Sequence, residues 1–311
     1  MTVDLTILIP TFDRPSEVNQ RLEEISNEFG SGIPVVIQVN PGQYTAEDIS
    51  RQSQLRKLVI RENQSNIGFV ANIVSGMLSI HTEWVWILGD DDPIRSGSKE
   101  EISTSIRICD QELAQMTVFN QWHRSQNEQG MVCRDVDDFV KATGFADCLF
   151  ISALVWRSSF LSENLGILID YSFTRASQAM IQLCNLSVGQ SAIYVRNQKL
   201  INYTGLHRWS RLDYLQRLDK IFYDPRLSNY KSQVFGFLLP QASWALSSSI
   251  AEVNSWGVLI TWIWLAARYN AKVFATLGPR EGLLFSLFLQ RAMLGHVAKH
   301  AKRHLRINHR K

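Results

Sequence analysis

The stretch WVWILGDDDPI, which runs from Trp84 to Ile94, raises the first question about this chain. Five residues typical of a buried strand run into a glycine and then into Asp90, Asp91 and Asp92. Adjacent carboxylates repel one another, and the repulsion grows where water is scarce. Either the aspartates form an acidic turn before a helix, with one of them as its cap, or they form a site that needs carboxylates.

The segments before this stretch alternate between apolar runs of strand length and helical patterns. Apolar runs at 5–9 and 33–40 fit strands of a parallel sheet that is covered on both faces, and 55–62 predicts a third, weaker strand. Apolar residues at helical spacing after Pro15 and again after Gly68 predict helices. The order strand, helix, strand, strand, helix, strand indicates an α/β domain with a mainly parallel sheet flanked by helices.

The domain is expected to continue past the aspartates to about residue 210. A capping box, SKEE at 98–101, predicts a helix that ends near Glu112. The polar segment 124–138 is expected to be a loop or a hairpin. Further strands are expected at 115–122, around 154–156 and within 191–205, with a helix at 177–188. We therefore divide the chain into a domain at 1–210, with halves 1–95 and 96–210, and a helical region at 211–311.

The composition is that of an ordinary globular protein. The chain has 311 residues, of which 45% are hydrophobic and 20% are charged, so it can bury a real core. A net charge of only +3 weighs against a dedicated nucleic-acid binder. The four cysteines form no C-x-x-C pair and are expected to be reduced thiols of a cytoplasmic protein. We expect neither a signal peptide nor a membrane-spanning helix.

The C-terminal region ends in a basic tail. From Pro279 to Lys311 there are eight Lys or Arg residues and one Glu. Four of these cations, at positions 299 to 306, fall close to one helical face, which is typical of an anchor attracted by anionic lipid. We expect peripheral attachment at the inner face of the plasma membrane; a helix pair packed on the core, with a solvated tail, is the alternative.

Three strand ends are expected to converge on one crevice. In open α/β sheets, ligands bind beyond the carboxyl ends of the strands, and residues 10–14, Asn40 and 90–92 all lie at such ends. A carboxylate cluster is tolerated where a hard divalent cation neutralises it. Mg²⁺ or Mn²⁺ is typically held by one or two carboxylates together with substrate phosphates. The residues therefore predict a site for a metal and a diphosphate.

Three motifs carry a resemblance to a known family. ILIPTFDRP at 7–15, NQSNIGFVANI at 63–73 and WVWILGDDD at 84–92, in this order and spacing, resemble family 2 glycosyltransferases of the GT-A fold. The form is nearest to the abequosyltransferase-like subgroup. The resemblance implies metal-dependent transfer of a sugar from a nucleotide-sugar to a hydroxyl of a glycan or lipid-linked glycan. It also implies inversion of the anomeric centre and a role in cell-surface polysaccharide synthesis.

The first motif would contact the donor. By the resemblance, Pro10, Thr11 and Phe12 lie along the nucleotide, with Phe12 or its backbone near the base. Arg14 is expected to approach the diphosphate, although a solvated residue on the first helical turn is an equal alternative. Asn40 stands where the family usually has an aspartate that contacts the base or ribose. That departure leaves the identity of the base open.

The other two motifs complete the implied donor and metal site. The middle motif contributes Asn66, Gly68 and Asn72. Its glycine would permit close approach of the backbone to the nucleotide, and Asn66 could equally cap the following helix. By the resemblance, Asp90 contacts the ribose and Asp91 binds the metal. Asp92 is either a second metal ligand or an outer-shell partner.

The general base is where the sequence departs most from the family. The family's acidic pair would fall near residues 172–180, which contain no carboxylate. Asp170 is the nearest candidate for the catalytic base, followed by Glu163 and Asp147, and each could instead be a surface carboxylate. The missing pair makes a non-catalytic, membrane-associated scaffold with a degenerate glycosyltransferase fold the alternative function.

One more motif of the implied site lies near the end of the domain. In GLHRWS at 205–210, His207 is expected near the metal or diphosphate and Arg208 near phosphate oxygens. The alternative is a loop with Trp209 packed beneath the histidine.

Other functions fit the sequence less well. A phosphatase with an Asp-x-Asp pair would carry it on the first strand. A sugar nucleotidyltransferase would need glycine in the loop after the first strand, and PTFDRP has none.

Overall fold

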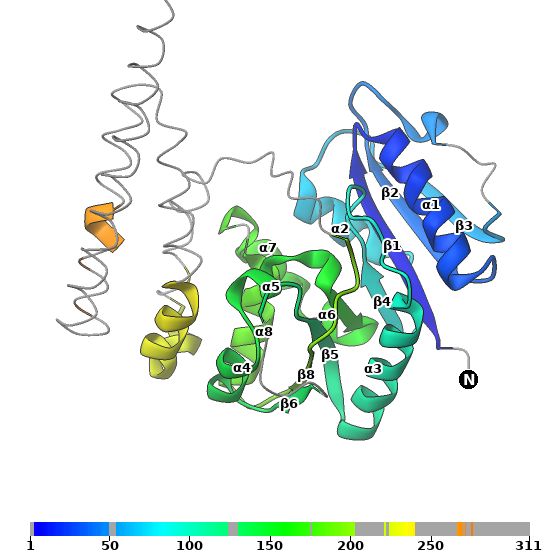
Figure 1. The fold of residues 1–311 in the computed structure, drawn as a ribbon. Coiled ribbons are helices and arrows are strands. Elements are labelled where there is room, and N and C mark those ends of the chain that lie inside the picture. The colour runs from blue at the N-terminus through cyan, green and yellow to red at the C-terminus, as the bar shows by residue number, and fades with distance from the viewer. Residues whose placement is uncertain are drawn as a thin grey trace, which may run out of the picture. The chain divides into compact units, whose positions relative to one another are not determined.

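The chain forms two compact units, which we describe separately. The computed structural model describes residues 3–49, 54–123, 130–174 and 176–202 of the first unit, which ends at Leu206. In the second unit, from His207 to Lys311, it describes only residues 221, 224–239, 266–269, 271 and 275. The first unit is the α/β domain drawn from blue to light green in Figure 1.

The described elements follow the predicted alternation. The strands are β1 (Leu5–Phe12), β2 (Pro34–Asn40), β3 (Lys57–Glu62), β4 (Trp84–Ile87), β5 (Ala114–Phe119), β6 (Met131–Cys133), β7 (Leu154–Arg157) and β8 (Ala192–Arg196). The α-helices are α1 (Pro15–Phe29), α2 (Phe69–Met77), α3 (Ser98–Glu112), α4 (Val136–Ala142), α5 (Phe145–Leu149), α6 (Ser158–Glu163), α7 (Leu165–Asp170) and α8 (Ser177–Ser187).

The described strands form one mixed, mostly parallel sheet in the order β3-β2-β1-β4-β7-β5-β8-β6. The first four strands are parallel to one another, and β5 is parallel to β8. β7 runs antiparallel to both β4 and β5, and β6 antiparallel to β8. The prediction of a mainly parallel sheet flanked by helices is confirmed. The start of β7 consequently lies at the same edge as the ends of β1, β2 and β4.

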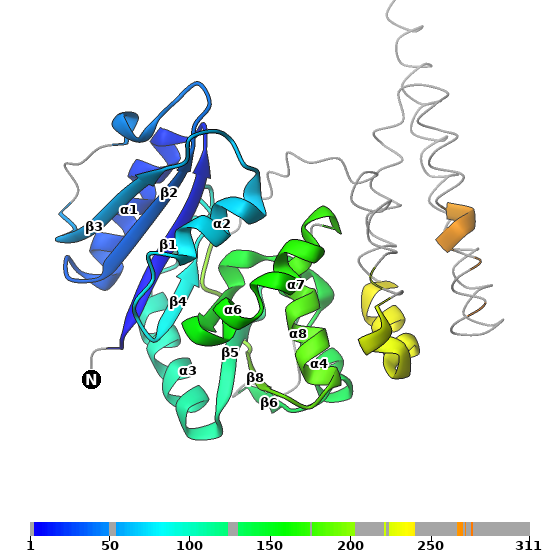
Figure 2. The ribbon, with the colours of Figure 1, turned by 180° about the vertical axis from the view of Figure 1, so that it is seen from behind.

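Helices cover both faces of the sheet, as Figures 1 and 2 show from opposite sides. Alternate side chains of β1, such as Ile7 and Ile9, join the core cluster that includes the buried face of α1. On the other face, α2 packs on β1 so closely that a Cβ atom at Gly76 would lie 2.5 Å from the Leu8 side chain. Burial of both faces explains why these strands are apolar without alternation.

Two local predictions need correction. The capping box was expected to open α3, but Gly97 is the N-cap residue and Ser98 is the first helical residue. The Ser98 hydroxyl instead lies within hydrogen-bond distance of the carbonyls of Arg95 and Leu200, so it ties the helix to a distant segment. The segment expected to be a loop or hairpin contains β6, which pairs with β8, and its last residues begin α4.

In the second unit, Pro225–Tyr230 form a 3-10 helix and residues 231–239 continue as helix. The basic tail lies outside the described residues. Within the part of the chain that is described, we find no helix that is both long and apolar enough to cross a membrane.

Candidate functional site

Asp90 is held in place at the end of β4 by residues from the end of β1. The Thr11 hydroxyl donates to its Oδ2 atom at 2.7 Å, and Arg14 Nη1 donates to its Oδ1 atom at 2.7 Å. Only 6% of the residue is exposed. Burial raises the pKa of Asp90, while Arg14 and the Thr11 hydroxyl oppose that rise. Two of the predicted strand ends are therefore joined directly.

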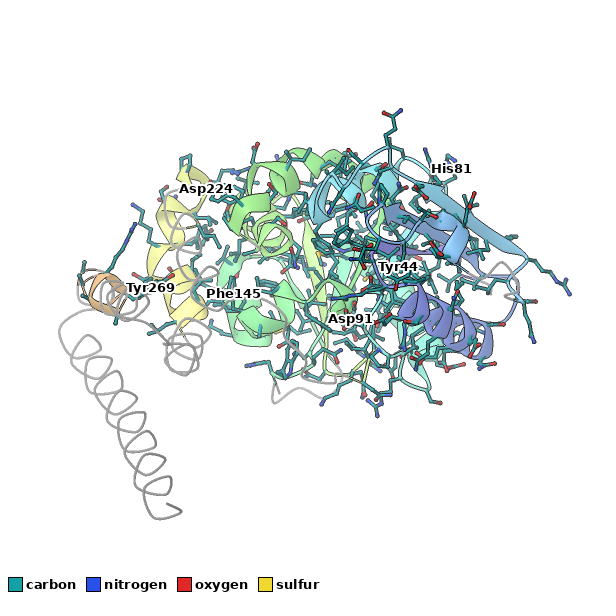
Figure 3. The ribbon with its side chains drawn as sticks, turned by 90° about the horizontal axis from the view of Figure 1, so that it is seen from above. Tyr44, His81, Asp91, Phe145, Asp224 and Tyr269 are labelled. Atoms are coloured by element: carbon teal, nitrogen blue, oxygen red, sulfur yellow. The ribbon has the colours of Figure 1, made fainter. Side chains whose placement is uncertain are left out.

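Asp91 is the exposed member of the three aspartates. Its side chain is 47% exposed, and its Oδ2 atom lies 2.6 Å from the same Nη1 atom of Arg14. Figure 3 looks down on this edge of the sheet, with Asp91 and Tyr44 labelled. Partial burial lowers the pKa of Arg14, but Asp90 and Asp91 together raise it above its ordinary value. Arg14 is therefore a shared counter-ion of two carboxylates and not a solvated residue.

Asp92 is turned into the protein. Its Oδ2 atom accepts a hydrogen bond of 2.6 Å from the Ser152 hydroxyl, which itself accepts one of 2.8 Å from the Gly89 amide. The Ser152 carbonyl is fixed by the indole N–H of Trp86 at 2.9 Å. A side chain at Gly89 would place a Cβ atom 2.4 Å from Asp92 Oδ2. The tryptophan and the glycine before the aspartates thus shape this turn.

Burial raises the pKa of Asp92 to about 7, although the bond from Ser152 opposes the rise. In the unfolded chain the Asp92 carboxyl loses its proton near pH 4, whereas in the folded protein it keeps the proton up to about pH 7. The contribution of this group to folding stability is therefore fully present below pH 4 and is lost as the pH rises to about 7. We expect Asp92→Asn to change stability little at pH 4.5 and to gain on the order of 2–4 kcal/mol at pH 8.

The measurement is chemical denaturation of both proteins in EDTA at several pH values. Glu23→Gln, on the exposed face of α1, is the control because it removes a solvated carboxylate. A stability difference between Asp92→Asn and wild type that does not change from pH 4.5 to pH 8 would contradict the prediction.

The middle motif builds a buried amide network at the ends of β2 and β3. Asn63 Nδ2 donates to Asn40 Oδ1 at 2.8 Å and to Asn72 Oδ1 at 2.7 Å. Asn72 Nδ2 donates to the carbonyl of Gln38 at 2.9 Å, and Asn40 Nδ2 to that of Gly68 at 3.2 Å. Asn40 and Asn72 are each 2% exposed. Their amides therefore tie the ends of β2 and β3 to α2 through hydrogen bonds to neighbouring protein groups.

Asn66 shapes the loop before α2. Its Oδ1 atom accepts a hydrogen bond of 2.9 Å from the Gly68 amide, which forms an Asx-type turn. Asn66 therefore lies two residues before the N-cap residue of α2 and is not itself the N-cap. Gly68 is itself the N-cap residue and has φ of +83°, where a side chain would be strained. The positive φ gives a backbone reason for glycine at this position, and the expected approach of its backbone to a nucleotide stays a prediction.

An aromatic rim borders this edge. Phe12 and Tyr44 are each 44% exposed, and a small hollow lined by Thr11, Arg14 and Tyr44, among others, lies there. Asp13, in the left-handed region with φ of +54°, accepts hydrogen bonds from the amides of Gln43 and Tyr44 at 2.7 and 3.2 Å. Asp13 thus ties the loop after β2 to the end of β1. Pro10 is buried within β1, one residue before Thr11.

The three candidate bases lie in different environments. Asp170, at the end of α7, and Glu163, at the end of α6, are exposed. The helix α7 packs against α2 and α8. Asp147 is fully buried. Its carboxylate accepts hydrogen bonds from the backbone amides of three successive residues, Gln121 to His123, at 2.5, 2.9 and 3.1 Å. Burial raises the pKa of Asp147, although the three hydrogen bonds oppose the rise. The carboxylate anchors the turn formed by these three residues.

The residues fit a divalent cation through Asp91 in particular. Asp91 presents an exposed carboxylate, and one or two carboxylates with substrate phosphates suffice for Mg²⁺ or Mn²⁺. Asp92 faces Ser152, so its predicted ligation gains no support from its placement. Within the described ranges, no three His, Cys, Asp or Glu residues cluster as a complete metal site. His207 and Arg208 lie outside the described residues.

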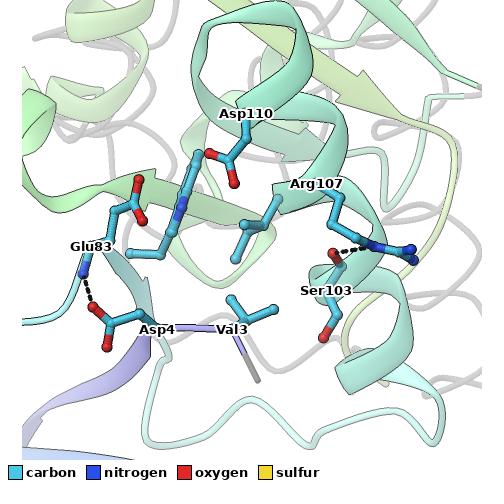
Figure 4. Close-up of a pocket in the computed structure, with 8 residues that line it drawn as sticks. Val3, Asp4, Glu83, Ser103, Arg107 and Asp110 are labelled. Atoms are coloured by element: carbon cyan, nitrogen blue, oxygen red, sulfur yellow. Dashed lines mark hydrogen bonds between the residues drawn. The ribbon is translucent and has the colours of Figure 1, made fainter. Parts of the chain in front are cut away.

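A larger pocket, of about 520 Å³, lies at the opposite edge of the sheet. It is lined by residues at the starts of β1 and β4 and by one side of α3, including Asp4, Glu83, Arg107 and Asp110 (Figure 4). The Glu83 amide donates to Asp4, and Arg107 to the carbonyl of Ser103. Because parallel strands put their carboxyl ends at the other edge, this pocket is separate from the aspartates.

Sequence reasoning missed several residues of the site, among them Tyr44, Asn63 and Ser152. Asn63 follows a predicted strand within the middle motif, so the strand-end rule could have found it. Ser152 could not be found in this way, because it lies 60 residues from Asp92. It comes close to that aspartate only because β7 pairs antiparallel with β4.

Comparison with known proteins identifies the fold. No family model matches the chain, and no curated protein matches it. Among solved structures, residues 1–349 of S. aureus TarS in complex with UDP-GlcNAc superpose with a TM-score of 0.58 at 13% identity. The alignment covers 95% of this chain and 89% of that one. The chain has the GT-A fold.

A second solved structure agrees with this assignment. The mannosyltransferase PcManGT from Pyrobaculum calidifontis, in complex with GDP-Man and Mn²⁺, has a TM-score of 0.52 at 14% identity. The alignment covers 95% of this chain and 86% of that one. At such identities the likeness establishes the GT-A fold alone, and membership of the abequosyltransferase-like subgroup stays a prediction.

Proposed function

We propose that this GT-A domain is a glycosyltransferase that moves a sugar from a nucleotide-sugar to a hydroxyl of a glycan or lipid-linked glycan. One observation carries the proposal: Asp90 and Asp91 are held together with Thr11 and Arg14 at the carboxyl ends of β1 and β4. In open α/β folds that edge is where nucleotides bind. The solved structures of TarS with UDP-GlcNAc and PcManGT with GDP-Man and Mn²⁺ support a nucleotide-sugar donor.

The donor would lie along the edge between the first and third motifs. Phe12 and Tyr44 offer exposed aromatic rings to the nucleotide base. Thr11 and the amide network of Asn40 and Asn72 keep the strand ends rigid beneath it. Asp90 is expected to contact the ribose. The guanidinium of Arg14 can donate to diphosphate oxygens, which it recognises in a forked geometry.

Asp91 would hold the divalent cation on the face that points to solvent. A bound cation would neutralise the negative charge that develops on the departing nucleoside diphosphate. Asp92 and Ser152 fix the turn that presents Asp91. The chain itself therefore supplies a carboxylate ligand, a guanidinium and a rigid turn at the leaving-group side.

Asp170 is the proposed general base. It is exposed at the end of α7, and α7 packs on α2, whose first turn belongs to the donor motif. From there it would take the proton of the acceptor hydroxyl as oxygen attacks the anomeric carbon, with inversion. Asp147 is unsuited to this role because three backbone amides already occupy its carboxylate.

The test is a two-step assay on the whole 311-residue chain. Binding of UDP, GDP and a panel of nucleotide-sugars is measured by thermal stabilisation with and without Mn²⁺. Release of nucleoside diphosphate in the presence of glycan acceptors is then followed for each donor that binds. Stabilisation followed by acceptor-dependent release supports the proposal. Binding without release by any acceptor favours the non-catalytic scaffold, and absence of all binding overturns both.

Asp170→Asn should lower acceptor-dependent transfer by about 10²-fold, because a positioned base contributes at least that much. Donor binding should not change, since the proposed base acts on the acceptor hydroxyl. The measurement is the rate of nucleoside diphosphate release with saturating donor and acceptor. Glu163→Gln, the other exposed carboxylate of this region, is the matched control. A full-rate Asp170→Asn enzyme would remove this residue from the mechanism.

The cellular setting is proposed from the sequence alone. The basic tail at 279–311 would attach the enzyme to anionic lipid at the inner face of the plasma membrane, near a lipid-linked acceptor. Removal of residues 297–311 should then reduce binding to vesicles that contain anionic lipid and leave donor binding unchanged.

A further inference from the structure

The contacts of Arg14 suggest a role beyond that of a phosphate ligand. Its Nη1 atom lies 2.7 Å from Asp90 Oδ1 and 2.6 Å from Asp91 Oδ2, so a single nitrogen bridges both carboxylates. This is the position at which a positive charge best relieves their mutual repulsion. Arg14 therefore stands, in the protein alone, where a cation held by Asp91 would exert its charge.

The two carboxylates depend on Arg14 to different degrees. Asp90 is buried and also accepts a hydrogen bond from the Thr11 hydroxyl. Asp91 is half exposed, and among the described residues Arg14 is the only cation within ion-pair distance of it. Asp90 therefore keeps one donor if the guanidinium leaves, while Asp91 becomes free to accept another cation.

A divalent cation and Arg14 cannot both face Asp91 without repelling each other. Two positive charges a few ångströms apart at a partly exposed site cost enough free energy to weaken metal binding markedly. A diphosphate removes this conflict, because it offers the guanidinium several anionic oxygens in a geometry that suits its fork. The metal and the donor diphosphate are then expected to help each other bind.

We propose that Arg14 couples the two ligands: it neutralises Asp91 while the donor is absent and passes to the diphosphate when the donor arrives. The divalent cation then binds Asp91 tightly only together with a nucleoside diphosphate. This inference rests on the proposed function. In this proposal, Arg14 makes tight binding of the cation depend on prior or simultaneous binding of the diphosphate. By thermodynamic reciprocity, the metal must strengthen diphosphate binding by the same factor.

The experiment measures free Mn²⁺ by electron paramagnetic resonance during titration of the full chain, with and without UDP or GDP. In the wild type, Mn²⁺ alone should bind weakly and the diphosphate should strengthen its binding at least tenfold. In Arg14→Gln, Mn²⁺ alone should bind about tenfold more tightly than in wild type, and the strengthening by diphosphate should shrink accordingly. Arg107→Gln, at the opposite edge of the sheet, should behave as wild type.

Arg14→Lys is a second variant that tests the inference if Arg14→Gln fails to fold. A lysine keeps the charge but lacks the planar fork, so its coupling should lie between those of wild type and Arg14→Gln. Mn²⁺ that binds Arg14→Gln alone no more tightly than wild type, with coupling intact, overturns the inference and leaves the proposed function standing. Absence of diphosphate binding to the wild type overturns the proposed function itself, and the inference with it.

Discussion

Asp91→Asn is expected to lower sugar transfer by about 10³-fold, with the fold intact. The amide keeps the shape of the carboxylate but lacks the charge that holds a divalent cation, and loss of that electrostatic stabilisation is worth several kcal/mol. Because the side chain is half exposed, its replacement should not destabilise the domain. The measurement is the rate of nucleoside diphosphate release at saturating donor, acceptor and Mn²⁺.

The neighbouring variant Asp92→Asn is the matched control for this prediction. Asp92 faces Ser152, whose hydroxyl can still donate to an amide oxygen, so transfer should fall by less than about tenfold. The two variants together separate the two aspartates that the sequence placed at the metal. Equal and large losses in both would show that Asp92 also binds the metal, and near-wild-type activity of Asp91→Asn would contradict the mechanism.

Asp147→Ala should be the most destabilising single substitution proposed for this domain, by about 3–5 kcal/mol. It leaves three successive backbone amides without their acceptor inside the protein, and each buried unsatisfied donor costs roughly 1–3 kcal/mol. Removal of the buried carboxylate charge offsets part of this loss of stability. The expected destabilisation is therefore smaller than the sum of the penalties for three unsatisfied amides. Urea denaturation followed by tryptophan fluorescence is the measurement.

Two further variants serve as controls for Asp147→Ala. Asp147→Asn keeps one acceptor oxygen and should lose about half as much free energy of unfolding. Asp135→Ala removes the N-cap acceptor of α4, a single amide contact, and should cost only about 1 kcal/mol. If Asp147→Ala were as stable as Asp135→Ala, the buried carboxylate would not anchor the turn at residues 121–123.

Much of the first half of the domain follows from the sequence. Apolar runs without alternation predict strands covered on both faces, and β1, β2 and β4 are such strands because α1 and α2 lie on opposite faces of the sheet. Parallel strands bring their carboxyl ends to one edge. The sequence could therefore place Thr11, Arg14 and Asp90 near one another without any knowledge of their contacts.

Local backbone needs were only partly visible in the sequence. Gly68 was predicted for close approach to a nucleotide, whereas the structure shows that it adopts a positive φ before α2. By contrast, the capping box at 98–101 was a local signal that the fold overruled, since Ser98 is within hydrogen-bond distance of a carbonyl 102 residues away. Short-range signals of this kind hold only where no tertiary contact offers the same side chain a better partner.

Tertiary structure alone decided which way each acidic group faces. The periodicity of apolar residues along the chain indicates which side chains share a face of a helix or strand. It does not determine which strands are neighbours or in which direction each strand runs. The antiparallel pairing of β7 with β4 brings Ser152 to Asp92 and turns that carboxylate inward, while Asp91 stays half exposed and pairs with Arg14. Burial of Asp147 under three amides likewise depends on the meeting of β5 and α5. Hydrogen bonds between residues 60 or more positions apart are fixed by strand order and register, which no local spacing encodes.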